Sequence, residues 1–198
     1  MTARNMSAPK ILVVPGSLRS QSYNVRLAAL ATKELTLAEA DVTRISLADY
    51  PLPIYDADLA RQSGPPLNAL RLKQLVAAHR GIFIASPEYN ASITPLLKNA
   101  IDWISTVREP GEAQLAVFQN RIFAIGGASP GRFGAMQSLL TLRQVLAVGC
   151  RAMVLPEQVS VPNAEQAFND MDELVDSRAA GQLKTVVKKL LDYVRMLG

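Results

Sequence analysis

Short apolar runs alternate with stretches of helical periodicity from one end of this 198-residue chain to the other. Each run has the length of a strand and is continuously apolar, which is typical of strands buried on both faces of a parallel sheet. Parallel neighbours need crossover helices, and such crossovers are right-handed. The alternation therefore predicts an α/β fold with helices on both faces of a doubly wound sheet. The five expected strands are residues 10–15, 42–46, 81–86, 121–126 and 152–155.

The segments between these strands have the spacing of amphipathic helices. In residues 93–104, apolar side chains recur at positions i, i+3, i+4 and i+7. Ser92 is the expected N-cap of this helix, and Pro95 falls in its first turn, where a missing N–H is tolerated. Further helices are expected to contain residues 27–35, 67–76, 135–148 and 183–194.

The position of a ligand site follows from this topology. A five-stranded doubly wound sheet is expected here with the strand order 2-1-3-4-5, and such sheets bind ligands at the carboxyl ends of their strands. Three loops follow strands at that edge, and they are residues 16–24, 87–92 and 127–134. These loops are the candidate site.

Length and composition indicate a single domain, residues 1–198, in which residues 1–9 form a flexible N-terminal extension. The apolar runs are all far shorter than the ~20 residues of a membrane span, so we expect no membrane partner. The net charge of +4 is scattered along the chain, which weakly favours an anionic ligand and does not indicate nucleic acid. The polar start and the single Cys150 favour a cytoplasmic location. With one histidine, His79, we expect no metal site.

The first loop has the character of a phosphate site. Gly16 permits a tight turn after the first strand, and hydroxyl groups and a guanidinium follow where a helix begins. The free N–H groups of a first helical turn attract an anion. The side chains expected to meet that anion belong to Ser17, Arg19, Ser20 and Ser22.

The second loop and the helix after it make the prediction specific. They read SPEYNASITPLLKNAIDW in residues 86–103, after GSLRSQSYN in residues 16–24 and before GGASPGRFG in residues 126–134. In order and spacing these motifs resemble the NADPH-dependent FMN reductase family. This is a flavodoxin-like family that includes quinone, azo-dye and chromate reductases. The resemblance covers residues 10–155, most of the chain.

The resemblance implies a role for residues in all three loops. Those implied to hold the FMN phosphate are Ser17, Arg19, Ser22 and Asn24. Those implied to line the isoalloxazine ring are Pro87, Glu88, Tyr89 and Asn90. Those implied to approach the ring edge through their backbone are Gly127, Ala128 and Ser129. The chain departs from the family pattern in the third loop, at Pro130 and at Ala135, where a glycine is expected.

The implied activity is that of an FMN-dependent NAD(P)H oxidoreductase. Hydride passes from NADPH or NADH to flavin N5, and a small acceptor is then reduced in a ping-pong cycle. The candidate acceptors are a quinone, an azo compound, a metal oxyanion and free flavin. Because the flavin carries the chemistry, no catalytic side chain is expected, and Glu88 is a poor candidate for an acid or base. Two alternatives stay open, a flavodoxin-type electron carrier and a binding module for another phosphorylated ligand.

Other segments suggest an oligomer. Residues 135–148 are apolar around most of the predicted helix, which favours a subunit interface in a homodimer or homotetramer, with Arg143 pairing across it. The proline-rich residues 49–66 are either a rim of the site or a dimer contact. Either Arg108 or Arg132 is a candidate partner for the 2′-phosphate of NADPH, and the spacing selects neither. Structural roles are expected for His79, Trp103 and Cys150.

Overall fold

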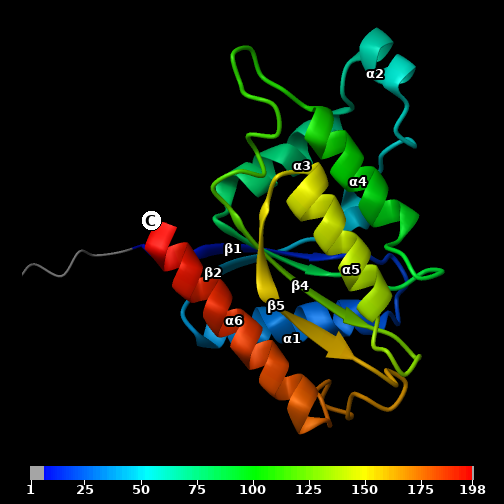
Figure 1. Ribbon diagram of the computed structural model, residues 1–198, viewed down its shortest axis with the longest axis vertical. Helices are drawn as coiled ribbons and strands as arrows, with labels where there is room; N and C mark the ends of the chain where they lie inside the picture. The colour runs from blue at the N-terminus through cyan, green and yellow to red at the C-terminus, as the bar shows by residue number, and fades with distance from the viewer. Residues whose placement is uncertain (1–6, 198) are drawn as a thin grey trace, which may run out of the picture.

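The computed structural model describes residues 7–197 and shows a parallel sheet between two layers of helices (Figure 1). All strands are parallel and stand in the order β2-β1-β3-β4-β5, which confirms the expected flavodoxin-like, doubly wound fold. The strands are β1 (Lys10–Pro15), β2 (Asp41–Arg44), β3 (Gly81–Ala85), β4 (Ile122–Ala128) and β5 (Met153–Val161). Of the expected extension at residues 1–9, the first six residues lie outside the described range.

Helices cover both faces of the sheet, as expected from the alternation of elements. Alternate residues of β1 point to opposite cores: Ile11 packs with α1 (Tyr23–Leu37) and α6 (Ser177–Leu197), whereas Leu12 packs with the helices of the other face. Those helices are α3 (Leu67–Ala78), α4 (Pro95–Thr106) and α5 (Met136–Gln144), which the π-helix η2 (Val145–Gly149) continues.

The proline-rich segment of residues 49–66, for which the sequence predicted no helix, contains the end of the 3-10 helix η1 (Leu47–Asp49) and the helix α2 (Ala57–Ser63). Asp56 caps α2, because its carboxylate accepts hydrogen bonds from the N–H groups of Asp58 and Leu59 at 2.7 and 3.0 Å. No residue of α2 is buried, and the helix projects from the body of the molecule in Figure 1. Without a buried face, α2 lacks the apolar period that predicted the other helices.

Two predicted boundaries were wrong. Thr94, not Ser92, caps α4: its hydroxyl accepts a hydrogen bond from the N–H of Leu97 at 3.2 Å, and Pro95 begins the helix as expected. Ser92 instead pairs with Tyr89 in a short hairpin. Strand β5 continues to Val161, past its predicted end at residue 155. The prediction stopped short because β5 is an edge strand whose second half is only partly buried. A partly polar edge strand lacks the continuous apolar run that marks a central one.

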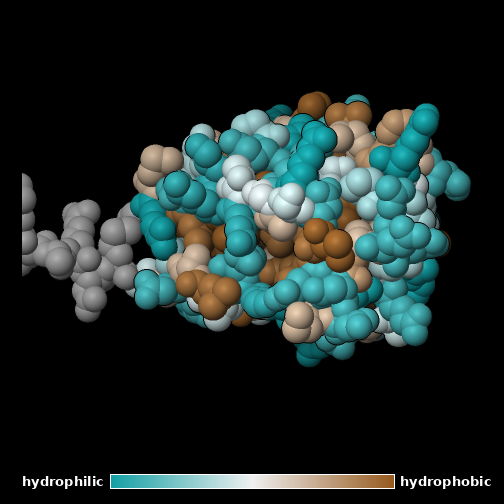
Figure 2. Space-filling view, turned by 90° about the horizontal axis from the view of Figure 1, so that it is seen from below, coloured by the Kyte–Doolittle hydropathy of each residue, from teal (hydrophilic) through white to brown (hydrophobic). Residues whose placement is uncertain are grey.

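The outer face of α6 is exposed to solvent. Three lysines lie on this face, and Lys184, Lys188 and Lys189 are all exposed. Figure 2 views the molecule from below, the side of α1 and α6 in Figure 1, and mostly hydrophilic residues cover this surface. Among the helices described here, including the long α6, none has the length and apolar character needed to cross a membrane.

Candidate functional site

The first loop ends in the cap of α1. The hydroxyl of Ser22 accepts a hydrogen bond from the N–H of Asn24 at 3.3 Å, and that of Ser17 accepts one from the N–H of Arg19 at the same distance. In both cases the hydroxyl proton stays free to donate to a ligand. The Arg19 side chain is exposed, with Nη2 3.5 Å from the carbonyl oxygen of Gln21 and the guanidinium 5.6 Å from the ring centre of Tyr23. Within the described residues Arg19 forms no ion pair.

Asn24 joins this loop to the third one. Its side-chain amide donates to the carbonyl oxygen of Ala128 at 2.8 Å, and its side-chain oxygen accepts from the N–H of Ala128 at 2.9 Å. Both residues are buried. The two polar atoms of the Asn24 side chain are therefore engaged by the end of β4, and they hold the start of α1 against it. A contact between Asn24 and a phosphate stays a prediction.

Glu88 joins the second loop to the helix that follows the third. Its Oε2 accepts hydrogen bonds from the N–H groups of Gln137 and Ser138, at 3.0 and 3.1 Å. A carboxylate at the first turn of a helix satisfies free donors and interacts favourably with the helix dipole. Glu88 thus caps α5, which has no cap at Ala135, the residue before its first turn.

The tip of the second loop is a two-residue hairpin. Tyr89 and Ser92 exchange backbone hydrogen bonds at 2.9 and 3.0 Å, and Asn90 and Ala91 between them have φ angles of +49° and +62°. Two successive positive φ angles are the mark of a type I′ turn, in which Asn is favoured at the first position and Gly at the second. The turn exposes Asn90, and it leaves the Tyr89 ring 54% exposed at the edge of the site.

The third loop is closely packed within the protein. A side chain at Gly127 would meet Cβ of Ala135 at 2.7 Å and the carbonyl oxygen of Ser86 at 2.8 Å, so only glycine fits. Ala135 itself has a φ of +65°, the conformation that the glycine expected at this position adopts without strain. Backbone hydrogen bonds also join Ser129 to both Val161 and Ala164 at 3.1 Å.

The three loops enclose a pocket of about 120 Å³. All the residues predicted for the site except Ser20, Asn90 and Gly127 line it, and so do two residues that were not predicted, Tyr23 and Pro130. Tyr23 lies between two predicted phosphate residues in the sequence, so its place could have been inferred from its neighbours. Asn90 lies outside the pocket because it occupies the exposed tip of the hairpin. Gly127 does not line the pocket because Ala135 and Ser86 pack against it.

The donors of this pocket fit a phosphate monoester. Two serine hydroxyls and an unpaired guanidinium stand at the start of α1, where the free N–H groups of the helix add partial positive charge. The pocket is smaller than the roughly 300–1,000 Å³ of a site that encloses a whole ligand.

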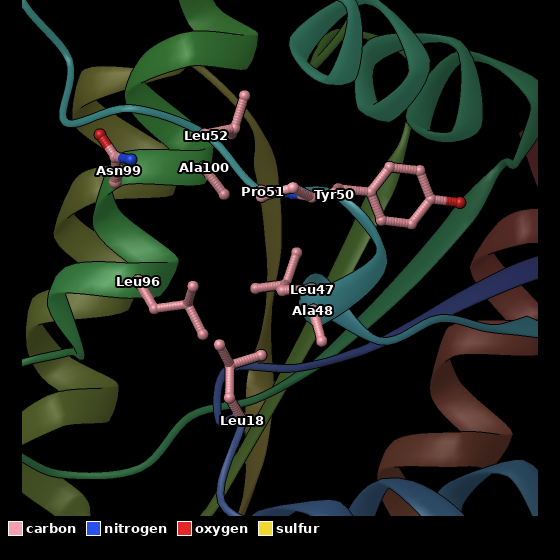
Figure 3. Close-up of a pocket in the computed structure, with 9 residues that line it drawn as sticks. All are labelled: Leu18, Leu47, Ala48, Tyr50, Pro51, Leu52, Leu96, Asn99 and Ala100. Carbon is pink, nitrogen blue, oxygen red and sulfur yellow. The ribbon is translucent and has the colours of Figure 1, made fainter.

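A second pocket adjoins the other side of the first loop, and its volume is about 240 Å³ (Figure 3). Figure 3 shows Leu18 of that loop facing Leu47 and Leu96 across it. Asn99 and Trp103 anchor the segment that closes the pocket, since both donate to the carbonyl oxygen of Pro53, at 2.9 and 2.7 Å. The proline-rich segment is therefore fixed to α4. Most side chains around the pocket are apolar.

The other singled-out residues have structural partners. His79 caps the end of α3, and its ring nitrogens bond to Leu75 and Thr43. Burial raises the pKa of the Cys150 thiol to about 11. Trp103 is fully buried. Arg143 donates to the carbonyl oxygens of Leu155 and Pro156 in its own chain, and a pairing of Arg143 across an interface stays a prediction.

Comparison with known proteins identifies the family. The model of the NADPH-dependent FMN reductase family matches residues 9–166. An NAD(P)H-dependent FMN reductase of Pseudomonas aeruginosa is 35% identical over 190 residues, which are 95% of this chain and 96% of that protein. A 2-hydroxy-1,4-benzoquinone reductase of a Burkholderia species is 33% identical over 189 residues, 95% of this chain and 97% of its own.

A solved structure agrees with these matches. FerB, a flavoenzyme NAD(P)H:(acceptor) oxidoreductase from Paracoccus denitrificans, superposes with a TM-score of 0.77 and 27% identity. The superposition covers 96% of this chain and all of that one. Family, fold and cofactor class therefore agree with what the loop motifs predicted. The chain belongs to the NADPH-dependent FMN reductase family, as an oxidoreductase that uses FMN and NAD(P)H.

Proposed function

We propose that the pocket at the start of α1 binds FMN by its phosphate and that the enzyme reduces a small acceptor, with a quinone as the first candidate. When bound, FMN supplies the redox chemistry: it accepts hydride at N5 from NAD(P)H and passes the electrons on in a ping-pong cycle. The observation that carries this proposal is the convergence of Ser17, Ser22 and the unpaired Arg19 in one pocket at a helix start. The quinone reductases among the relatives favour the acceptor class.

The protein binds and positions the cofactor. Ser17 and Ser22 donate their hydroxyl protons to the phosphate, and Arg19 adds a charged hydrogen bond. Asn24 fixes the distance between this subsite and the third loop through Ala128. The second and third loops would hold the ring with one face open, so that nicotinamide and acceptor would reach it in turn. Asn90, at the hairpin tip, would meet the ring outside the pocket.

The absorbance spectrum is the first test. The purified protein supplied with FMN and then desalted should keep the yellow flavin band, and NADPH added without oxygen should bleach it promptly. An electron carrier of the flavodoxin type would keep FMN but would not be bleached. A module for another phosphorylated ligand would stay colourless.

The Arg19→Ala variant tests the phosphate assignment. Loss of one charged hydrogen bond of about 1.5–3 kcal/mol should raise the Kd for FMN by a factor of roughly 10 to 150. The matched control is Arg61→Ala, which removes an exposed arginine of α2 that, among residues 7–197, forms an ion pair with its helix neighbour Asp58 alone. Equal FMN affinity in Arg19→Ala and the parent would show that the phosphate lies elsewhere.

We also propose that the chain forms a homodimer or homotetramer through the outer face of α5 and η2. Leu140 and Val148 on this face are 59% and 76% exposed, and burial of such side chains stabilises an interface. Light scattering should give a multiple of the 21.4 kDa chain mass. The Leu140→Asp variant should shift the mass towards the monomer. A monomeric parent protein would overturn this part of the proposal.

A further inference from the structure

The sequence indicated two arginines as candidate partners for the 2′-phosphate of NADPH, and the fold places them at opposite edges of the sheet. Arg108 follows the end of α4 and therefore lies at the amino edge of the sheet, where its Nη2 is 3.4 Å from the carbonyl oxygen of Glu112. Arg132 lies in the loop between β4 and α5, at the carboxyl edge. In Figure 1 the loop after α4 is at the upper left and the loop after β4 is at the lower right. Only Arg132 is on the side of the FMN pocket.

Arg132 lines a further pocket, with a volume of about 250 Å³, together with a second arginine. Arg178, in the first turn of α6, reaches the same pocket from a segment far away in the sequence. Within residues 7–197 neither guanidinium forms an ion pair or donates a hydrogen bond. The Arg132 guanidinium lies 4.6 Å from the ring centre of Phe133, whose side chain is 56% exposed. Two guanidinium groups that form no ion pair among the described residues thus stand at this pocket, and that of Arg132 lies over the partly exposed Phe133 ring.

This pocket and the FMN pocket share one loop. Residues 128–130 line the FMN pocket, and Arg132 and Phe133 line the other. Backbone hydrogen bonds from Asn163 to Gly131 at 3.3 Å and from Ala164 to Ser129 at 3.1 Å fix the loop against the segment after β5. A ligand that extends from the flavin ring along this loop would reach the two arginines.

The lining chemistry fits a phosphate monoester on an adenosine. A phosphate monoester carries close to two negative charges at neutral pH, and guanidinium groups match it with paired donors. Asp176 is the acidic residue of the lining, and its Oδ1 accepts from the backbone N–H of Arg178 at 2.9 Å, so this oxygen is engaged by the start of α6. The exposed Phe133 ring offers a stacking surface for a purine.

We propose that this pocket binds the adenosine 2′-phosphate end of NADPH and that Arg132 and Arg178 make the enzyme prefer NADPH over NADH. The inference rests on the proposed function, because it assumes that the nicotinamide reaches a flavin in the neighbouring pocket. NADH lacks the adenosine 2′-phosphate, so the two guanidinium groups would not raise its affinity for the enzyme.

The test compares both nicotinamide cofactors in single variants. Arg132→Gln and Arg178→Gln should each lower kcat/KM for NADPH by about tenfold or more and leave kcat/KM for NADH within about twofold, because a charged hydrogen bond is lost for one cofactor only. The matched control is Arg108→Gln, which should change neither value. A parent enzyme that uses both cofactors equally, or variants that change both values alike, would overturn the inference.

A binding measurement keeps this test independent of turnover. In calorimetry on the FMN-free protein, adenosine 2′,5′-bisphosphate should bind more tightly than adenosine 5′-monophosphate, and Arg178→Gln should weaken only the bisphosphate, by about tenfold. If NADPH fails to bleach the flavin, the proposed function fails, and this titration alone decides the site. Unchanged bisphosphate affinity in both variants would overturn the inference whatever the enzyme assay shows.

Discussion

Replacement of Asn24 by alanine distinguishes a structural tether from a direct ligand contact. In the structure the Asn24 side chain makes two hydrogen bonds to the backbone of Ala128, at 2.8 and 2.9 Å, between segments 104 residues apart. The family resemblance alone implies that Asn24 contacts the FMN phosphate. The two interpretations predict different effects on a protein without FMN.

The expected loss of stability follows from the groups left behind. The Asn24→Ala variant leaves both the N–H and the carbonyl oxygen of Ala128 without a partner, and Ala128 is only 3% exposed. Each buried group left unpaired costs about 1–3 kcal/mol. Asn24 and Ala128 both line the FMN pocket, so water can reach part of this space and lower the cost. We therefore expect a loss of about 2–4 kcal/mol.

Urea unfolding of the FMN-free protein measures this loss. With a slope of about 3 kcal/mol per M, the midpoint should fall by about 1 M. The matched control is Ser17→Ala, whose hydroxyl accepts a single hydrogen bond at 3.3 Å. It should weaken FMN binding and change the stability of the FMN-free protein by less than about 1 kcal/mol.

The tether would be refuted by a stable variant that has lost FMN affinity. If FMN-free Asn24→Ala unfolds within about 0.5 kcal/mol of the parent and binds FMN much more weakly, Asn24 acts on the ligand directly. Lower stability together with weaker FMN binding supports the tether, because a loose Ala128 would displace the third loop.

Three further predictions concern stability and pH. Ala91→Gly should raise the free energy of unfolding by about 1 kcal/mol, seen as a higher Tm, because Ala91 is exposed and its φ of +62° suits glycine; no gain would exclude strain in this turn. Burial raises the pKa of the Cys150 thiol to about 11, so the native state keeps this proton to a higher pH than the unfolded state does. The free energy of unfolding should therefore fall as the pH rises from about 9 to 11, and Cys150→Ala should abolish this fall. A hydrogen bond from the buried Lys73 lowers the pKa of Glu112, so this pair should stabilise the fold above about pH 4.5 and lose its effect as the pH falls further. In Glu112→Gln, the free energy of unfolding should depend less on pH below about 4.5 than in the parent.

Local patterns were enough to predict the architecture and the place of the site. Central strands such as β3 are buried at every residue, so their apolar runs mark them in the sequence. Strand and helix alternation then limits the topology, and the topology places the loops after β1, β3 and β4 at one edge. The edge strand β5 and the exposed helix α2 were misjudged because neither is buried enough to show a clear apolar period.

Short motifs in the sequence were sufficient to identify the family and the cofactor class, and they predicted most of the residues that line the pocket at the start of α1. The contacts that these residues make became visible in the folded chain. It showed that Glu88 caps α5 and that Asn24 is engaged by Ala128. It also placed Arg178 beside Arg132 in one pocket. Such pairs lie tens of residues apart or more, and their contact depends on how packed helices and strands bring distant backbone segments together, which no local spacing encodes.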